Sequence, residues 1–532
     1  MSAPAGQPSA RRRAHVRVYE HVQAIQAGDT GAAAELAALV AEAASRGWSE
    51  VVLAGMFGEA IDAWFRRDGR VATLVARLLE RSLVEGDQAM LAVGLALRAD
   101  PSVSGADDAT ASRRDGDLVR AMVLLEDRGG DVLARITAHT ACGIALYHRG
   151  LFELGDEQYK AALDAGSTEE PEVVEALVAP VVFDRAELQV AWAAVLFQLG
   201  ELEALEQRQR TWVELDASAC RLDLPDAWQD ELHAFGLLLR SMVGQDCAAE
   251  ARACARRQAS QGGGGGRSEG LFCLASAVCD VRAGRASADE NASAAAGRID
   301  VDLFPHLYDL ALYLLAVIEA RRGTGAGLRY ARRQLEQSWA SRLAALASMS
   351  ARIDAERLAS EREMLSRHAR LDDLTGVGNR RALEVFLGDL DRRGVRQIAL
   401  ILLDVDRFKE VNDRYGHLAG DSVLVAIAGI LQQSVRPCDL AVRLGGDEFA
   451  VVLADVTIEV ASQRALDCLA CIDAQRFESG RAVFAVSASA GIAVGDPAGI
   501  VDLRAEADAA LYRAKAGAGQ RPARSRLVRA TD

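Results

Sequence analysis

The stretch AVRLGGDEFAVVL, at residues 441–453, decides the fold of the C-terminal part of the chain. Strand-forming runs at Ala441–Arg443 and Phe449–Leu453 flank a Gly-Gly turn, which is the pattern of a β-hairpin. Strand and helix patterns alternate around it, so we predict an α/β or α+β domain. Further strands are expected at residues 398–403 and 483–494, and helices at residues 422–434 and 456–472.

Acidic residues follow the expected strands. Asp404-Val405-Asp406 closes the strand at residues 398–403, and Asp447-Glu448 stands at the hairpin tip. Carboxylates on neighbouring strand ends can converge on a cation pair, and hard cations such as Mg²⁺ prefer oxygen ligands and nucleotide phosphates. The adjacent Gly-Gly leaves room for a phosphate at the backbone. The pattern favours metal-assisted phosphoryl or nucleotidyl transfer, although a single Asp at a strand end is often a turn or cap residue.

These residues resemble the GGDEF family of diguanylate cyclases. Gly445-Gly-Asp-Glu-Phe449 is the family's literal signature, and the resemblance covers roughly residues 371–526. It implies an enzyme that condenses two GTP molecules into cyclic di-GMP and releases two pyrophosphates. It also implies a cyclase or palm-like α/β (α+β) fold with a central, mostly antiparallel sheet. The other motifs that carry the resemblance are DDLTGVGNRR (372–381), DVDRFKEVND (404–413), Tyr415-Gly-His417, Gly420-Asp421 and DAALYRAK (508–515).

The resemblance assigns a metal site and catalytic residues. Asp404, the backbone carbonyl of Val405 and Asp447 would hold Mg²⁺, with Mn²⁺ as a substitute. Asp447 would also be the base for the GTP 3′-hydroxyl, and Glu448 would assist at the metal and phosphate site. Lys409 is placed with the catalytic residues because it would neutralise the triphosphate.

The resemblance also assigns substrate contacts. Asn412 and Asp421 would read the guanine edge, since a carboxylate can accept from adjacent N–H donors. Lys515 would neutralise phosphate charge together with Lys409. The alternatives are a solvated helix face for both lysines and a helix cap for Asp421. The complete set of expected substrate contacts is Phe408, Asn412, Asp421, Gly445, Gly446 and Lys515.

Two further features concern regulation and the phosphate clamp. Arg436-Pro-Cys-Asp439 is an RxxD segment with five residues between Asp439 and Gly445, and the resemblance implies that this spacing serves feedback inhibition by cyclic di-GMP; a surface ion pair is the alternative. The chain departs from the family after Lys515, where Gly519 replaces the expected phosphate-contacting Arg and Arg521 is a possible substitute.

The N-terminal region, residues 13–330, reads as helix after helix, rich in Ala, Leu, Glu and Arg. Residues 143–161 and 193–205 resemble the paired helices of tetratricopeptide repeats, with a Gly ending each first helix. We expect a sensory or partner-binding solenoid, with a plain helical bundle as the alternative. The run Gly262–Gly266 is expected to be a loop, because no Gly-Lys-Ser/Thr follows it to make a phosphate-binding loop.

Residues 331–370 are predicted to form one long helix, since they lack Pro and Gly. Positions spaced by seven, including Trp339, Leu346 and Ile353, give a loose coiled-coil pattern that could join two subunits. The alternative is a helix packed on its own chain. Catalysis requires two GTP sites to face each other, so a homodimer is expected.

The bulk numbers set limits on function. The chain has 532 residues, with 61 Lys and Arg against 76 Asp and Glu, for a net charge of −15. This argues against a nucleic-acid partner. We expect no membrane span or signal peptide, a cytoplasmic location, and short tails at residues 1–12 and 527–532. Two alternative functions stay open: a degenerate domain that binds GTP or cyclic di-GMP without turnover, and an adaptor that binds a protein partner through its helices.

Overall fold

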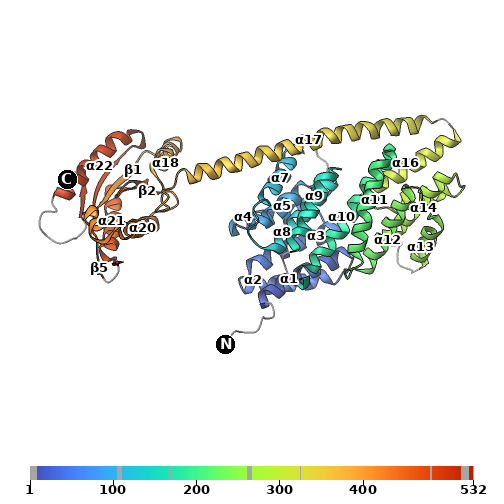
Figure 1. Cartoon of the computed structure of the whole chain (residues 1–532), viewed down its shortest axis with the longest axis horizontal. Helices are drawn as coiled ribbons and strands as arrows, with labels where there is room; N and C mark the ends of the chain where they lie inside the picture. The colour runs from blue at the N-terminus through green and yellow to red at the C-terminus, as the bar shows by residue number, and fades with distance from the viewer. Residues whose placement is uncertain are drawn as a thin grey trace. The chain divides into compact units, whose positions relative to one another are not determined.

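The computed structural model describes residues 9–104, 111–167, 171–260, 267–323, 325–479, 482–516 and 526–530. The chain divides into two compact units, residues 1–358 and 359–532. The described part of the first unit is helical and the second holds a sheet, which confirms the predicted fold classes (Figure 1). Gly262–Gly266, Gly519 and Arg521 lie outside the described residues. Within the described ranges, no helix has the length and apolar character needed to cross a bilayer.

The helices of the first unit follow one another through short connections. Helix α1 begins at Ala10, where the Ser9 side chain accepts a hydrogen bond from the Arg12 backbone N–H. The predicted tail at residues 1–12 is therefore wrong for its last three residues, because this cap starts a helix there. The helices are α1 (Ala10–Gln26), α2 (Ala32–Ser45), α3 (Ser49–Phe65), α4 (Val71–Glu85), α5 (Gln88–Ala99), α6 (Pro101–Ser104), α7 (Ala111–Leu124), α8 (Val132–Tyr147), α9 (Phe152–Gly166), α10 (Pro171–Leu199), α11 (Leu202–Ala219), α12 (Asp226–Met242), α13 (Ala248–Ser260), α14 (Arg267–Ala283), α15 (Ala288–Arg298) and α16 (Pro305–Arg322).

Small residues let neighbouring helices pack closely. A Cβ at Gly143 of α8 would stand 2.6 Å from Cε1 of Tyr159 on α9, so only glycine fits at this contact. Gly150 follows α8 with φ +66°, a left-handed conformation that ends helices. The predicted helix pair at residues 143–161 is present, whereas its membership of the tetratricopeptide class stays a prediction.

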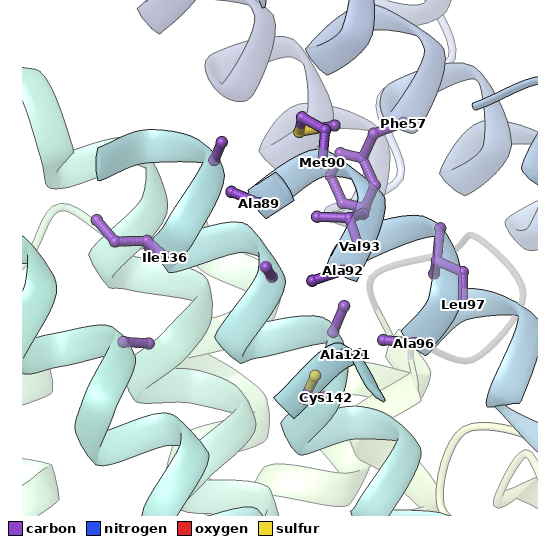
Figure 2. Packing of buried hydrophobic residues seen from close by; sticks show 14 of the residues in the cluster. Phe57, Ala89, Met90, Ala92, Val93, Ala96, Leu97, Ala121, Ile136 and Cys142 are labelled. Atoms are coloured by element: carbon purple, nitrogen blue, oxygen red, sulfur yellow. The ribbon is translucent and has the colours of Figure 1, made fainter. Parts of the chain in front are cut away.

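Helix α5 lies at the centre of one of the two cores of this unit. Figure 2 shows Ala89, Met90, Ala92 and Val93 among the surrounding helices, and nearly every residue of α5 is buried. A helix that is apolar all round must be covered on every side. This core joins helices from α1 to α10.

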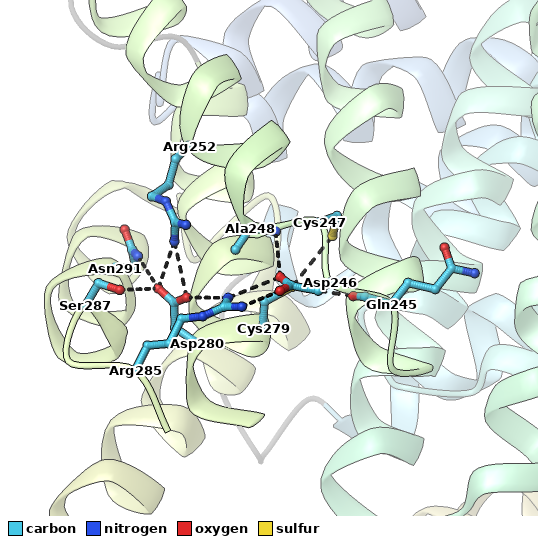
Figure 3. Close-up of polar contacts among 10 residues, drawn as sticks. All are labelled: Gln245, Asp246, Cys247, Ala248, Arg252, Cys279, Asp280, Arg285, Ser287 and Asn291. Carbon is cyan, nitrogen blue, oxygen red and sulfur yellow. Dashed lines mark hydrogen bonds and ion pairs between the residues drawn. The ribbon is translucent and has the colours of Figure 1, made fainter. Parts of the chain in front are cut away.

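A buried carboxylate joins the helices at the other end of the unit. Asp280 of α14 accepts hydrogen bonds from Ser287 at 2.7 Å, Asn291 at 2.8 Å, and both Arg252 and Arg285 at 3.1 Å (Figure 3). Burial alone would raise the pKa of Asp280, but these hydrogen bonds outweigh it and lower that pKa. The charged carboxylate thus connects α13, α14 and α15.

Helix α17 (Ala326–His368) is continuous over 43 residues. Met349 and Ile353 are buried in the first unit's core, and Trp339 and Leu346 pack against it. Three of these residues belong to the predicted coiled-coil seam, so the chain's own helices cover that part of it. This finding corrects the prediction: up to Ile353 the alternative of a helix packed on its own chain describes α17.

Polar contacts add to this packing. The Arg342 guanidinium donates through Nε to the Gly150 carbonyl at 2.6 Å and forms an ion pair with Glu153. Arg352 pairs with Asp115 at 3.0 Å. The first half of α17 is therefore an integral helix of the first unit.

The second unit is built on a five-stranded sheet of order β2-β3-β1-β6-β7. The β1–β3, β1–β6 and β2–β3 pairs are antiparallel and the β6–β7 pair is parallel. Residues 527–529 of the predicted C-terminal tail instead belong to the edge strand β7, because they pair with β6. The elements are α18 (Arg380–Arg392), β1 (Ile398–Val405), α19 (Phe408–Tyr415), α20 (His417–Ser434), β2 (Leu440–Gly445), β3 (Glu448–Ala454), α21 (Ile458–Ala474), β4 (Phe477–Ser479), β5 (Ala482–Phe484), β6 (Ala488–Gly495), the 3-10 turn Pro497–Gly499, α22 (Ile500–Ala516) and β7 (Arg526–Arg529).

Strand β1 is apolar from Ile398 to Leu403 because helices cover both faces of the sheet. Its residues alternate between two cores. Ile401 and Leu403 join the core under α20 and α21, whereas Leu400 and Leu402 join the core under α18 and α22. This double burial explains the unbroken apolar run, and it leaves the strand's polar end at Asp404.

The packing of α17 is testable by placing a charge on its buried face. Ile353→Asp should lower the free energy of unfolding of the helical unit by about 3 kcal/mol or more, because it removes apolar burial and buries a carboxylate. Leu358→Asp is the matched control, since Leu358 on the same helix is 60% exposed whereas Ile353 is 8% exposed. Urea unfolding followed by circular dichroism measures both. Equal stabilities for the two variants would contradict the packing.

Candidate active site

Three carboxylates meet where β1 and the β2–β3 hairpin end. Asp404, near the end of β1, is paired in register with Glu448, and the Val405 N–H donates to the Asp447 carbonyl at 3.3 Å. Burial raises the pKa of Asp404 against the hydrogen bond from Lys515, and the negative charges of Asp447 and Glu448 raise it further. The cluster therefore carries excess negative charge that a cation would relieve.

Lys515 supplies one positive charge to this cluster. It lies in the last turn of α22, and its Nζ is 2.7 Å from Oδ1 of Asp404. The position of α22 depends on Gly491 of β6, where a Cβ would stand 2.2 Å from the Ala507 carbonyl oxygen and 2.3 Å from the Leu511 backbone nitrogen. The helix backbone thus rests directly on the strand, which fixes where Lys515 reaches the carboxylates.

A cleft of about 570 Å³ opens beside the carboxylates. Its volume lies within the usual range of small-molecule sites, roughly 300–1,000 Å³. Its lining mixes acidic groups with several basic ones, a combination suited to a polyphosphate that arrives with a divalent cation. The charged lining residues are Asp404, Asp406, Arg407, Lys409, Glu410, Arg414, Asp447, Lys515 and Arg526.

The hairpin tip has a fixed conformation. Gly445 has φ +147° and Gly446 has φ +57°, values that side-chain-bearing residues rarely adopt. Arg443 donates to the Gly446 carbonyl through Nε at 3.0 Å and Nη2 at 2.8 Å, and to Asp372 through Nη1 at 3.0 Å. Burial opposes ionisation of Asp372, but hydrogen bonds from Thr375 and Arg443 lower its pKa overall. Arg443 therefore ties the tip to the segment that opens the unit.

Asp406 has a structural role, because both oxygens of its carboxylate accept hydrogen bonds from serine side chains. Its carboxylate accepts hydrogen bonds from the Ser487 and Ser489 hydroxyls, each at 2.7 Å, and its N–H donates to the Ser487 carbonyl at 2.9 Å. The next residue, Arg407, has φ +55° at the start of α19. Asp406 thus anchors the strained turn between β1 and α19 to β6.

The comparisons with known proteins agree with this geometry. The sequence profile of the family described as "Diguanylate cyclase, GGDEF domain" matches residues 369–521. Residues 369–521 form a GGDEF domain. The match covers the hairpin, the carboxylate cluster and the cleft.

Relatives of the GGDEF domain include enzymes from several bacteria. The chain is 39% identical over 187 residues to diguanylate cyclase DgcP of Pseudomonas aeruginosa, covering 34% of this chain and 28% of the relative. It is 35% identical over 175 residues to diguanylate cyclase VdcA of Vibrio cholerae, covering 31% and 50%. The chain thus spans between about a quarter and a half of the length of these relatives.

A solved structure is also similar. The crystal structure of the GGDEF domain of DgcB from Caulobacter crescentus, in complex with c-di-GMP, is 29% identical to the matched region. The match covers 31% of this chain and 97% of that one, with a TM-score of 0.28 over the whole chain.

The expected metal ligands of the GGDEF domain fit a hard divalent cation. The described residues contain no group of three His, Cys, Asp or Glu side chains that could hold a metal. The expected set needs only two, because the Val405 carbonyl would be the third oxygen. Asp404, Val405 and Asp447 all line the cleft, and the pKa of Asp404 is raised first by burial and then by the negative charges of Asp447 and Glu448. GGDEF diguanylate cyclases generally use Mg²⁺ or Mn²⁺, and these oxygen donors suit both.

The expected guanine-reading residues lie on α19 and α20. A Cβ at Gly420 would stand 2.0 Å from Oδ1 of Asn412 and 3.1 Å from Cζ of Phe408. The Asn412 side chain therefore lies against the turn of α20 that carries Asp421, and both side chains are partly buried. Phe408 and the exposed Lys409 line the neighbouring cleft.

The RxxD segment divides into a buried and an exposed residue. The Asp439 carboxylate is 8% exposed and accepts hydrogen bonds from the backbone N–H of Arg436 at 3.0 Å and of Ala454 at 3.1 Å. Arg464 of α21 lies 3.4 Å from the same carboxylate. Asp439 thus fixes the loop, whereas the Arg436 side chain is exposed and accessible to a ligand.

The roles of several supporting residues were not predicted from the sequence. Arg443, Ser487, Gly491 and Arg464 each hold a predicted site residue or its element in place. The one available signal was Arg443, a charged residue within a strand pattern. The other three look like ordinary surface or strand residues until the chain is folded.

The role of Arg443 predicts a loss of stability when it is removed. Arg443→Ala should lower the free energy of unfolding of the GGDEF domain by about 1.5–3 kcal/mol, the usual worth of hydrogen bonds to charged groups. Arg396→Ala is the control, because the Arg396 side chain is 78% exposed and its ion pair with Asp496 is long, at 4.0 Å. This variant should change the free energy of unfolding by less than about 0.5 kcal/mol. Hydrogen exchange at residues 445–448 should accelerate in Arg443→Ala alone, and unchanged exchange there would rule out the anchor.

Proposed function

We propose that this protein is a diguanylate cyclase that condenses two GTP molecules into cyclic di-GMP and two pyrophosphates. The observation that carries the proposal is the cluster of Asp404, Asp447 and Glu448 beside a cleft that also presents Lys409 and Lys515. Carboxylates that bind divalent cations, next to lysines that neutralise phosphates, are the groups that nucleotidyl transfer needs. The names of the relatives support the same activity.

The residues have separate tasks in the proposed reaction. Asp404, the Val405 carbonyl and Asp447 would hold Mg²⁺, which supplies charge neutralisation at the phosphates. Asp447 accepts the proton of the GTP 3′-hydroxyl, and Glu448 assists at the metal and phosphate site. The 3′-oxygen then forms a bond to the α-phosphorus of the second GTP, and the bond to its β-phosphate oxygen breaks to release pyrophosphate. The 3′-hydroxyl of the second nucleotide then attacks the α-phosphorus of the first in the same way, which releases the second pyrophosphate and closes the ring.

Lys409 and Lys515 are proposed to stabilise the triphosphate. Lys515 is bound to Asp404 at 2.7 Å, so it already stands next to the metal ligands. Asn412 and Asp421 are proposed to bind guanine through its N–H and carbonyl edge, with Phe408 and the tip glycines Gly445 and Gly446 completing the contacts.

Catalysis by this arrangement requires two copies of the chain. Each GGDEF domain would provide one set of metal ligands and one guanine site, while the reaction joins two nucleotides twice. We therefore propose a homodimer in which two GGDEF domains face each other. Control is proposed to come from the helical unit, which also offers its surface to a protein partner. Product feedback is proposed to act through cyclic di-GMP bound at Arg436, in the loop that Asp439 fixes.

The metal site is testable with an isosteric substitution. Asp447→Asn should reduce cyclic di-GMP synthesis at least roughly a hundredfold, because loss of an outer-shell metal partner alone costs 10–100-fold. Incubation with GTP and MgCl₂ followed by mass spectrometry of the product measures this. The control is Asp391→Asn on the exposed face of α18, which should retain full activity. Near-normal synthesis by Asp447→Asn would contradict the proposed metal site. If the unaltered chain binds GTP without forming product, the domain is a binding module and not an enzyme.

The guanine site is testable with two identical substitutions on α20. Gly420→Ala should displace the Asn412 side chain and weaken GTP binding about tenfold, or ~1.4 kcal/mol. Gly429→Ala is the control, because a Cβ there meets nothing within 4 Å; it should bind GTP normally. Titration with a fluorescent GTP analogue, in competition with GTP or ATP, measures both variants. Equal competition by ATP and GTP would contradict guanine recognition by Asn412 and Asp421.

A further inference from the structure

A pocket of about 120 Å³ lies inside the helical unit, far along the chain from the cyclase residues. Helices α3, α8, α10 and α12 are among those that form its walls, and the lining residues range from Gln26 to Phe304. Its largest apolar side chains include Trp64, Phe183 and Trp228. A cavity of about 150 Å³ lined by apolar groups is large enough for benzene, so this pocket can admit a compact ligand group.

The aromatic walls are ordered. The Phe183 and Trp228 rings stack with centroids 4.9 Å apart and planes at 25°. Trp64 donates through its indole N–H to the Ser102 carbonyl at 3.3 Å, and its ring is held edge-on by Phe65 with centroids 4.8 Å apart. Faces of Trp and Phe rings attract cations through their quadrupoles.

A carboxylate without a partner faces the same pocket. Asp184 of α10 lines it, and the Oδ2 atom of Asp184 is buried with no hydrogen-bond partner. Burial raises the pKa of Asp184 to about 7, against the opposing charge of His148. His148 does not neutralise it by contact, because its Nδ1 is 2.9 Å from Oδ1 of Asp100. A buried, unpaired carboxylate is costly unless a cation or donor meets it.

The remaining charges of the lining have the same sign. Glu187 and Glu231 also line the pocket, and Glu231 is buried. Among the described lining residues there is no Lys or Arg. An anionic ligand such as a phosphate or nucleotide would meet carboxylates without a basic side chain to pair with, apart from His148. The chemistry therefore selects a ligand that is positively charged and partly apolar.

We propose that this pocket binds a small aliphatic ammonium compound, with Asp184 as its counter-charge and the stacked Phe183 and Trp228 rings as its apolar wall. The ammonium group supplies the missing hydrogen-bond donor or positive charge to Oδ2 of Asp184. The alkyl part packs against the aromatic rings. The faces of these rings also attract the positive charge of the ammonium group. The site is separate from the cyclase cleft, so binding does not depend on the proposed enzymatic activity.

Isothermal titration calorimetry on the full chain tests the proposal directly. The probes are butane-1,4-diamine and tetramethylammonium chloride, at pH 8 where Asp184 is mostly ionised and at matched ionic strength. At least one should bind saturably, and 2,2-dimethylpropan-1-ol, a neutral molecule of tetramethylammonium-like shape, should bind at least about tenfold more weakly. No saturable binding of either cation, or equal binding of the alcohol, would overturn the proposal.

Variants locate the site. Asp184→Asn keeps the side-chain shape and should weaken binding of the cation at least about tenfold. Glu203→Gln, which removes an exposed carboxylate on α11 of the same unit, should leave it unchanged. Hydrogen exchange on the unaltered chain locates the site without relying on a variant that could fold poorly. The bound probe should slow exchange in residues 181–188 and 226–232. Unchanged affinity in Asp184→Asn, or protection confined to other segments, would place the cation elsewhere.

Discussion

The register of β1 against its two neighbours is the constraint on which the GGDEF domain depends. Because β1 is buried on both faces, each of its side chains has one permitted direction, and a slip of one residue would exchange the two cores. This register sets Asp404 opposite Glu448 and brings Val405 to the Asp447 carbonyl. The acidic cluster is therefore a consequence of where the apolar run ends. The charge of the buried Asp404 is tolerated because Lys515 approaches it from another element.

Local patterns predicted much of this domain from sequence. The hairpin follows from the Gly-Gly turn between strand-forming runs, and the acidic cluster follows from residues placed where strands stop. What could not be predicted are contacts between distant segments. Nothing near Arg443 in the sequence indicates that it holds Asp372, and nothing near Asp439 indicates that its carboxylate is used by backbone N–H groups. Such contacts depend on tertiary packing, which periodicity does not encode.

In the helical unit, the spacing of apolar residues could not predict which surfaces pack together. A seven-residue spacing of apolar side chains along α17 describes a face, but not what covers it. In this chain the core of the first unit covers the face at Ile353, with Arg342 bound to the Gly150 carbonyl beside it. No sequence pattern indicates the pocket around Asp184, because its lining residues come from many helices and range from Gln26 to Phe304. Cavities of this kind arise only from the way in which helices are stacked.

Gly491 has a consequence for which substitutions the GGDEF domain can accept. Where a helix rests on a strand through side chains, a nearby side chain can often move to admit an added methyl group. At Gly491 the α22 backbone touches the strand directly, so a side chain there would meet main-chain atoms that cannot rotate away. Any residue larger than glycine would push α22 off β6 and carry Lys515 away from Asp404. The place of one positive charge is thus set by the absence of a single methyl group.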